Sequence, residues 1–372
     1  MHKNNKHIRI IISGGGTGGH IFPALAIADA LKQIQPVDIL FVGAEGRMEM
    51  EKVPQAGYPI KGLPVKGFSR KDPAKNFQVL VKLIKSLRMA RRIIKEFRPH
   101  VVVGVGGYAS GPVLWQANKL GIPTLLQEQN SYAGITNKLL AKRANIICVA
   151  YDKMERYFPA KKIENLGNPI RPAVLEVNQY DTADARKAWD LDPDKKTVLV
   201  VGGSLGAGTI NASLEKALNQ LNENSQVQWI WQCGNFYYNA LQTRIGPHLG
   251  NHIKVQPFIA EMNRAYAAAD VIISRAGAGT LSELSIVGKP VMLVPSPNVA
   301  EDHQTKNAMA LVEKGAALRI PDCEAESRLV NEVFKLLEQP EQQKQLSAAI
   351  KKLAKPHAAR QIAERVLKLI NK

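Results

Sequence analysis

Four glycine-rich segments hold the residues of this 372-residue chain whose types and spacing are best suited to chemistry. They are GGGTGGH (14–20), GVGGYASGP (104–112), GGSLGAG (202–208) and SRAGAGTLSE (274–283). Each follows an apolar run typical of a buried strand and leads toward a helical pattern. Glycine lets a backbone approach a phosphate closely, and the N-terminus of a following helix offers free N–H groups. We therefore expect phosphate-bearing ligands at these segments.

The first segment has two other interpretations. Gly14, Gly16 and Gly19 match the Gly-x-Gly-x-x-Gly fingerprint of dinucleotide-binding enzymes, and Glu45 could then bind a ribose. A tight strand–helix turn without a ligand is the structural alternative. Neither interpretation explains the other three segments, so we favour one cleft lined by several helix N-termini.

Short apolar runs alternate with helical patterns in both halves of the chain. The expected strands are 8–13, 38–43, 101–107, 123–129, 145–150, 197–203, 228–234, 253–258, 270–277 and 290–296. Helical patterns cover 23–34, 77–97 and 359–372. This alternation predicts an α/β fold with two Rossmann-like domains, each a parallel sheet covered by helices on both faces.

The domain boundary should lie near GNPIRPAV (167–174), where two prolines break regular structure. We therefore expect domains at 1–171 and 172–356. The C-terminal segment, about 357–372, is an amphipathic helix expected to pack back on the first domain.

Seven motifs follow one another in order between about residue 8 and residue 310. They are GGGTGGHIFP (14–23), GVGGYASGP (104–112), QEQN (127–130), GNPIR (167–171), GGSLGA (202–207), SRAGAGTLSE (274–283) and DHQTKNA (302–308). The series resembles that of the MurG family, the peptidoglycan glycosyltransferases that use UDP-N-acetylglucosamine and lipid I. The resemblance implies the GT-B fold, in which two Rossmann-like domains face each other across a cleft.

The resemblance also implies an activity. That activity is inverting transfer of N-acetylglucosamine to the 4-hydroxyl of the lipid-linked muramyl sugar, with release of UDP. The first domain would take the acceptor and the second the UDP-sugar, with no metal cofactor. Alternatives are a related GT-B enzyme with another glycolipid acceptor, a UDP-N-acetylglucosamine epimerase, and a basic membrane-binding protein with a vestigial nucleotide cleft.

Two residues are candidates for the catalytic base that inverting transfer requires. His20 closes the first glycine segment, and imidazole titrates near neutral pH. Glu128 in QEQN is the second candidate. It ranks below His20 because a carboxylate there could equally orient its loop. A helix-start histidine that bonds a neighbouring backbone group or a phosphate is the alternative for His20.

The resemblance assigns substrate-binding roles to a larger set of residues. Arg171 and Ser204 suit diphosphate oxygens, Glu283 suits both ribose hydroxyls from the first turn of its helix, and Ile259 matches the uracil position. The alternatives are a surface salt bridge for Arg171, a helix cap for Ser204 and core packing for Ile259. For Glu283 the alternative is an acid favoured by the helix dipole or a capping box with Thr280. The complete set is Thr17, Gly18, Gly19, Asn130, Arg171, Ser204, Ile259, Ala278, Gly279, Thr280, Leu281, Ser282, Glu283, Gln304 and Asn307.

Some apparent metal and redox signals are better explained as structure. Asp190, Asp192 and Asp194 resemble a metal-binding DxD motif but lie in a turn-like segment. His248 and His252 have zinc-like spacing, yet nearby glycine and proline would break the aligning helix. Three scattered cysteines argue against a disulfide framework, and Cys148 should be core.

Charge is distributed unevenly along the chain. The net charge is +18, and residues 1–171 carry 27 Lys/Arg against 11 Asp/Glu. Twelve of those cations lie in 61–98, beside an apolar stripe at helical spacing. We expect the stripe (Phe77, Leu80, Val81, Ile84, Leu87, Ala90, Ile94, Phe97) to pack on the sheet.

The basic patch itself, with Leu63, Val65 and Phe68, should face an anionic membrane surface. No nucleic-acid motif accompanies the charge, and the N-terminus does not resemble a signal peptide. We therefore expect a peripheral protein at the cytoplasmic face of the bacterial plasma (inner) membrane.

Overall fold

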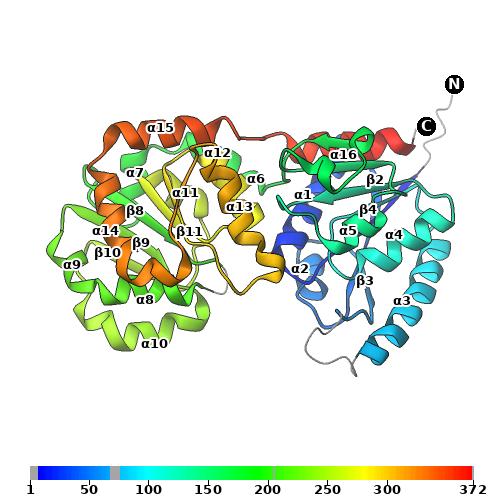
Figure 1. Cartoon of the computed structure of the whole chain (residues 1–372), viewed down its shortest axis with the longest axis horizontal. Coiled ribbons are helices and arrows are strands. Elements are labelled where there is room, and N and C mark those ends of the chain that lie inside the picture. Colours follow the sequence, from blue (N-terminus) through cyan, green and yellow to red (C-terminus); the bar gives the residue numbers. More distant parts are fainter. Residues whose placement is uncertain (1–6, 68–75, 204–205, 371–372) are drawn as a thin grey trace. The chain divides into compact units, whose positions relative to one another are not determined.

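The computed structural model describes residues 7–67, 76–203 and 206–370. The chain forms two compact units (Figure 1). Unit 1 comprises Met1–Arg171 and Lys355–Lys372, and unit 2 comprises Pro172–Ala354. The division follows Arg171, next to the proline that the sequence marks as a break in regular structure.

Unit 1 is built on a seven-stranded parallel sheet of order β3-β2-β1-β4-β5-β6-β7. The strands are β1 (Ile8–Ser13), β2 (Val37–Ala44), β3 (Ile60–Leu63), β4 (Val101–Gly104), β5 (Thr124–Glu128), β6 (Ile146–Val149) and β7 (Ile163–Asn165). The helices are α1 (Gly18–Ile34), α2 (Glu49–Gln55), α3 (Asn76–Phe97), α4 (Ser110–Lys119), α5 (Ile135–Leu140) and α16 (Ala358–Ile370), with short 3-10 turns at Met154–Arg156 and Ala160–Lys162.

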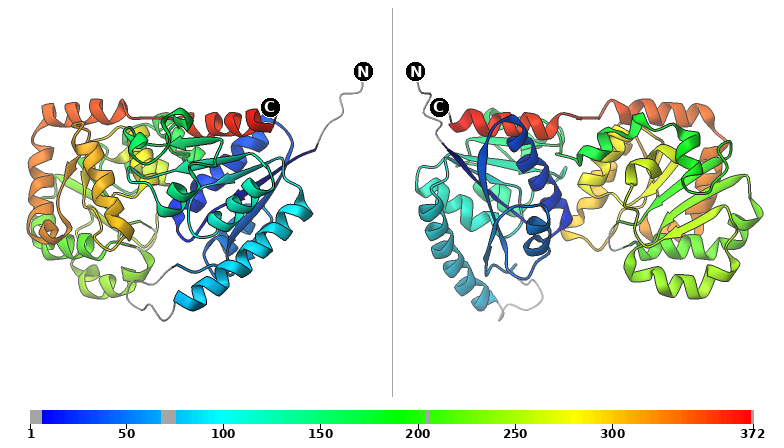
Figure 2. Two further views of the ribbon diagram at one scale, coloured as in Figure 1. Left: turned by 45° about the vertical axis from the view of Figure 1, so that its right-hand side comes forward. Right: turned by 180° about the vertical axis from the view of Figure 1, so that it is seen from behind.

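Continuous apolar runs form this sheet because both of its faces are covered. Ile10 and Ile12 of β1 pack in a cluster with residues of α1 and α16, whereas Ile11 packs in the opposite cluster with residues of α3 and α4. Figure 2 shows the helices on the two sides of the sheet. Cys148 of β6 is buried in the first of these clusters, which confirms that it is core.

Unit 2 repeats the design with a six-stranded parallel sheet of order β10-β9-β8-β11-β12-β13. The strands are β8 (Lys196–Val201), β9 (Val227–Gln232), β10 (Ile253–Gln256), β11 (Val271–Ser274), β12 (Val291–Leu293) and β13 (Leu318–Arg319). The helices are α6 (Pro172–Leu175), α7 (Thr182–Lys187), α8 (Gly208–Lys216), α9 (Leu218–Glu223), α10 (Asn235–Ile245), α11 (Met262–Ala268), α12 (Ala278–Val287), α13 (His303–Val312), α14 (Ala325–Leu337) and α15 (Pro340–Lys351), with 3-10 turns at Val177–Gln179, Gly246–His248, Ala300–Asp302 and Asp322–Glu324.

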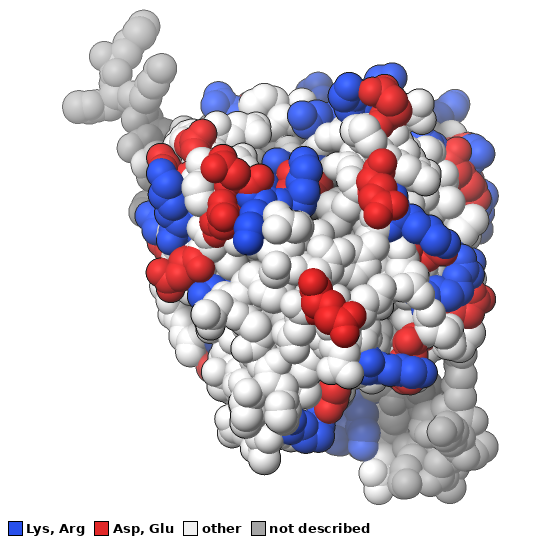
Figure 3. Space-filling model, turned by 90° about the vertical axis from the view of Figure 1, so that its left-hand side faces the viewer, with Lys and Arg blue, Asp and Glu red and all other residues white. Residues whose placement is uncertain are grey.

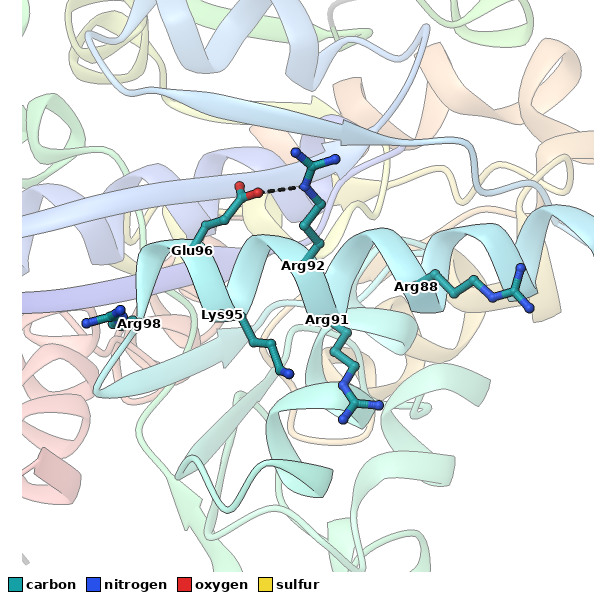
Figure 4. A pocket seen from close by; sticks show the side chains of 6 residues that line it. All are labelled: Arg88, Arg91, Arg92, Lys95, Glu96 and Arg98. Carbon is teal, nitrogen blue, oxygen red and sulfur yellow. Dashed lines mark hydrogen bonds and ion pairs between the residues drawn. The ribbon is translucent and has the colours of Figure 1, made fainter.

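Figure 3 shows one face of unit 2, where basic and acidic side chains are interspersed. This mixture agrees with the near balance of 18 Lys/Arg and 20 Asp/Glu over residues 172–354. The positive excess of the chain therefore belongs to unit 1.

The exposed part of α3 differs from the expectation. Ala90 and Ile94 are buried as predicted, but Phe77, Leu80, Val81 and Ile84 are 44–73% exposed. The amino-terminal half of α3 therefore presents its apolar stripe to the outside, and the prediction that the whole stripe packs on the sheet is wrong.

The loop residues next to α3 also differ from the expectation. Leu63 was predicted to face a membrane, but it ends β3 and is fully buried, and Val65 packs against the same core. Phe68 lies outside the described residues. Among the described helices, none is long and apolar enough to cross a bilayer.

Helix α16 completes the core of unit 1. Ile362, Ala363 and Val366 are fully buried in the cluster that contains Ile10 and Ile27. Arg365 of α16 also forms an ion pair with Glu164 of β7, with Nε 2.5 Å from Oε2. Helix α16 thus contributes to the same core as β1, although the two elements are far apart in the sequence.

We expect Ile362→Ala to lower the free energy of unfolding of unit 1 by about 2–5 kcal/mol, because the substitution leaves a cavity against α1. Chemical denaturation measured by circular dichroism tests this. The matched control is Arg360→Ala, an exposed residue of the same helix. Equal stability of the two variants would contradict the packing of α16 described above.

Candidate active site

The glycine loops of unit 1 meet where the strand order reverses, between β1 and β4. Loop Gly14–Gly16 follows β1, and loop Val105–Gly107 follows β4. A Cβ on Gly14 would collide with the Val105 side chain, and one on Gly107 would collide with the Gly15 carbonyl oxygen. The two loops therefore touch through their backbones. In doubly wound sheets this reversal point is where ligands bind.

The ring of His20 packs against the second of these loops. His20 is the third residue of α1, and its Nδ1 lies 3.3 Å from the Thr17 hydroxyl. A Cβ on Gly106 would come within 2.9 Å of both Cδ2 and Nε2 of the ring, and Gly106 has a φ of +92°. A side chain at 106 would thus strain the backbone and force the His20 ring to move.

The start of α1 presents backbone rather than side chains. Thr17 is the N-cap residue, but its hydroxyl makes no capping bond, and Gly18 and Gly19 form the first turn. This helix begins five residues before the predicted start at Pro23, which lies inside it. Pro23 lacks only the N–H that would donate to Gly19.

Glu128 ends β5 and is buried. Its carboxylate accepts from the Gly134 N–H at 3.0 Å and from Asn137 Nδ2 at 2.9 Å. It also accepts from the backbone N–H and the side-chain amide of Asn130, at 3.1 and 3.3 Å. Four donors from the following loop and from α5 support an orienting role for Glu128, and its role as a base stays a prediction.

A buried amide network, which sequence reasoning missed, leads toward Arg171. Gln127 Nε2 donates to Asn168 Oδ1 at 2.9 Å, and Asn168 Nδ2 donates to the Gln129 carbonyl at 3.0 Å. Gln129 Nε2 in turn donates to the Val105 carbonyl at 2.8 Å. The network connects the QEQN segment, the second glycine loop and the segment that ends at Arg171. Polar residues in otherwise apolar strands were the available signal.

Unit 2 has the corresponding reversal point between β8 and β11. The loop after β8 packs on Tyr237 of α10, since a Cβ on Gly206 would lie 2.7 Å from the ring and one on Gly208 would lie 3.0 Å from its hydroxyl. Ser204 lies outside the described residues, so its predicted role stays a prediction.

The loop after β11 leads into the amino-terminal turn of α12. Gly279 has open space where a side chain would be, and Thr280 and Ser282 are partly exposed. Ala278 and Leu281 are buried, so their side chains are not accessible to a ligand, and the Leu281 N–H donates to the Gly277 carbonyl at 2.9 Å. Ile259, after β10, is 2% exposed and is restricted in the same way.

Glu283 occupies a different place from the one predicted. It is the sixth residue of α12 and not part of the first turn, so a capping box with Thr280 is wrong. Its side chain is buried, and the Tyr266 hydroxyl donates to Oε2 at 3.4 Å.

Two amides of α13 hold the loop that precedes α12. Gln304 Oε1 accepts from the Ala276 N–H at 3.1 Å and from the Ser296 N–H at 2.9 Å. Asn307 Nδ2 donates to the Ala276 carbonyl at 3.5 Å. Because two backbone donors occupy Gln304 Oε1, its amide is oriented with Nε2 as the end left to donate.

An acid that sequence reasoning missed joins the two loops of unit 2. Asp322 pairs with the Arg275 guanidinium, and its Oδ2 accepts from the Thr209 hydroxyl at 2.9 Å. Arg275 also donates to the Val294 carbonyl at 3.0 Å. Thr209 is the second residue of α8 and Arg275 follows β11, so Asp322 connects the two loops.

The residues considered as metal ligands have local partners. Asp192 Oδ1 accepts from the Asp194 N–H at 3.0 Å, as in a turn, and His252 Nε2 lies 3.0 Å from the Leu221 carbonyl oxygen. Over the described ranges, no group of three or more His, Cys, Asp and Glu side chains could hold a metal ion.

Comparison with known proteins places these loops in a family. Residues 10–149 match the glycosyltransferase family 28 N-terminal domain, and residues 197–365 match the C-terminal domain of the same family. The chain is 56% identical over 367 residues to a Bacteroides thetaiotaomicron protein, covering 98% of each. That relative is named UDP-N-acetylglucosamine–N-acetylmuramyl-(pentapeptide) pyrophosphoryl-undecaprenol N-acetylglucosamine transferase. The chain belongs to the MurG family of glycosyltransferases.

Solved structures agree with membership of the MurG family. The Acinetobacter baumannii MurG crystal structure matches with a TM-score of 0.78 and 30% identity, covering 97% of this chain and 99% of that one. A UDP-N-acetylglucosamine 2-epimerase matches with a TM-score of 0.65 at 15% identity, which shows the shared fold alone. The predicted GT-B fold and the glycosyltransferase class are confirmed. The interpretation of the first glycine segment as the fingerprint of a dinucleotide-binding enzyme is wrong.

We expect Gly106→Ala to lower the rate of glycosyl transfer by about 100-fold, because the new methyl group would displace the His20 ring from its position. Gly121→Ala is the matched control: Gly121 also has a positive φ, of +70°, but nothing lies within 4 Å of its Cβ. Initial rates of UDP release should separate the two variants. Similar rates would mean that the contact between Gly106 and His20 does not matter for transfer.

Proposed function

We propose that this chain transfers N-acetylglucosamine from UDP-N-acetylglucosamine to the 4-hydroxyl of undecaprenyl-pyrophosphoryl-N-acetylmuramyl-pentapeptide, lipid I, to give lipid II for peptidoglycan synthesis. The observation that carries the proposal is near-full-length similarity to MurG-family relatives, at 56% identity to the Bacteroides thetaiotaomicron and Phocaeicola vulgatus enzymes. The names of both relatives specify this donor and this acceptor.

Unit 2 would bind the UDP part of the donor. The start of α12 has room at Gly279 and the positive end of a helix dipole, which favours phosphate oxygens. Glu283, one turn further along the helix, would accept hydrogen bonds from the ribose hydroxyls. The backbone at Ile259 would contact uracil. Gln304 Nε2 would donate to a hydroxyl of the sugar, with Asn307 holding the loop beside it.

Unit 1 would bind the acceptor and supply the base. His20 lies at the meeting point of two glycine loops, and the start of α1 at Thr17, Gly18 and Gly19 offers backbone to an anionic acceptor. Neutral imidazole at His20 would take the proton of the attacking hydroxyl. Asn130 and Arg171 would contact sugar and diphosphate oxygens.

We propose that transfer needs no metal cofactor. The leaving UDP carries its charge on the diphosphate, and the helix N-termini of α8 and α12, with Ser204 and Arg171, would stabilise that charge. A transfer assay with a chelator tests whether a metal ion is needed.

Membrane contact would come from α3. Phe77, Leu80, Val81 and Ile84 follow an i, i+3, i+4, i+7 pattern and are exposed, and Lys82 and Lys85 are neighbouring cations in the sequence. An apolar stripe beside lysines suits the interface of an anionic bilayer. We propose that the chain is a peripheral protein at the cytoplasmic face of the bacterial plasma membrane.

Calorimetric titration with UDP-N-acetylglucosamine, UDP-glucose and NAD tests the donor. We expect tight binding of the first, weaker binding of the second and none of NAD. Glu283→Gln should weaken UDP binding by about 10- to 100-fold, because hydrogen bonds to a charged acceptor are lost. Glu341→Gln, an exposed acid of unit 2 paired with Lys344, should bind like the parent.

The product distinguishes the remaining alternatives. Lipid I as acceptor should yield lipid II and UDP, whereas an epimerase would convert UDP-N-acetylglucosamine without any acceptor. UDP affinity unchanged by Glu283→Gln would refute the ribose assignment. No UDP release with any glycolipid would instead favour a membrane-binding protein with a vestigial cleft.

Vesicle sedimentation tests the membrane surface. We expect binding to phosphatidylglycerol vesicles, weakened by salt, and about tenfold weaker binding of the double variant Leu80→Ser, Ile84→Ser. Leu139→Ser removes a leucine of α5 that is even more exposed and is the control. Binding of the double variant at the level of the parent would show that α3 does not contact the bilayer.

A further inference from the structure

Glu49 is an acid in the core of unit 1. It is the first residue of α2, and it is 1% exposed. Its Oε2 accepts from the Gly16 N–H at 2.9 Å, and its Oε1 accepts from the Ala44 N–H at 2.9 Å. The carboxylate therefore bridges the loop after β1 and the end of β2. Over the described ranges, no lysine or arginine forms an ion pair with it.

The fit around this carboxylate is close on both sides. A Cβ on Gly15 would collide with the carboxylate, and one on Gly43 would lie 2.6 Å from Glu49 Cγ. Gly15 and Gly16 have φ values of +147° and +89°, which side-chain-bearing residues rarely adopt. The loop thus holds an uncommon conformation, and Glu49 is the side chain that bonds to it.

Glu49 also occupies one of the backbone donors of the first glycine loop. In a dinucleotide-binding loop, backbone N–H groups of this kind face the pyrophosphate of the ligand. Here the protein's own carboxylate accepts from Gly16. The protein itself therefore sets the conformation of this loop and provides a hydrogen-bond acceptor for one of its N–H groups.

We propose that Glu49 is a positioning residue for transfer: it fixes the Gly14–Gly16 loop and, through it, the start of α1 that carries His20. The inference rests on the proposed function, since it concerns how the base is held. Glu49 does not contact the reacting atoms. Its effect should appear in the chemical step, because an error of about 1 Å in the position of a base can cost roughly 100-fold in rate.

Glu49→Gln is the test variant, since it keeps the shape but turns one acceptor into a donor facing an N–H group. We expect kcat to fall at least about tenfold, with UDP affinity within twofold of the parent, because unit 2 binds the donor. Glu51→Gln is the matched control: Glu51 lies on the same helix, exposed, and bonds Lys52 and Gln55. It should behave like the parent.

A second measurement separates positioning from simple stability. Hydrogen exchange of the peptide spanning residues 14–19 should accelerate in Glu49→Gln and not in Glu51→Gln. Assays well below the melting temperature of each variant remove the effect of unfolding. The pH profile of kcat should keep its shape, because the base itself is unchanged.

Three outcomes would overturn the inference. They are parental kcat in a folded Glu49→Gln, an equal loss of UDP affinity, and unchanged exchange over residues 14–19. If Glu49→Gln does not fold, Glu49→Asp, which is one methylene too short to bridge both N–H groups, takes its place with the same expected results. A parent without transfer activity would contradict the proposed function, while the exchange measurement would still test the Glu49 bridge.

Discussion

Backbone-to-backbone contact between loops at the reversal point of a parallel sheet is the constraint on which this structure depends. In unit 1, Gly14 and Gly107 can carry no side chain, because the neighbouring loop occupies the space. In unit 2, the Cys233 carbonyl and the Tyr237 ring impose the same requirement on Gly206. Loops without side chains expose N–H groups, and those groups suit phosphate-bearing substrates. The glycine content of the motifs is thus a packing requirement with a chemical consequence.

Such loops leave backbone groups that no helix or strand satisfies, and buried polar side chains take them up. Glu49 and Glu128 accept from loop amides in unit 1, and Gln304 does so in unit 2. Removing one of these partners would leave a buried N–H unsatisfied, at a cost of about 1–3 kcal/mol. The loops are therefore held by side chains that need not touch a substrate.

Much of the fold could be predicted because its strands are long apolar runs bounded by glycine. The short edge strands β3, β7 and β13 were missed, since edge strands of two to four residues have too little pattern to detect. The motifs located both pairs of loops correctly. Glu49 and Asp322 were missed because their partners are distant in sequence, and a lone acid in a helical stretch is usually a solvated one.

The position of α16 has a consequence for biosynthesis. Unit 1 is discontinuous in sequence: its sheet is complete by residue 165, yet Ile362 and Val366 belong to its core. Unit 2 is contiguous in sequence and is synthesised before α16. Until α16 is made, the apolar face of α1 that packs on it stays uncovered. Unit 1 therefore acquires its full core only after α16 has been made, so a nascent chain arrested before residue 358 lacks the helix that covers this face of α1.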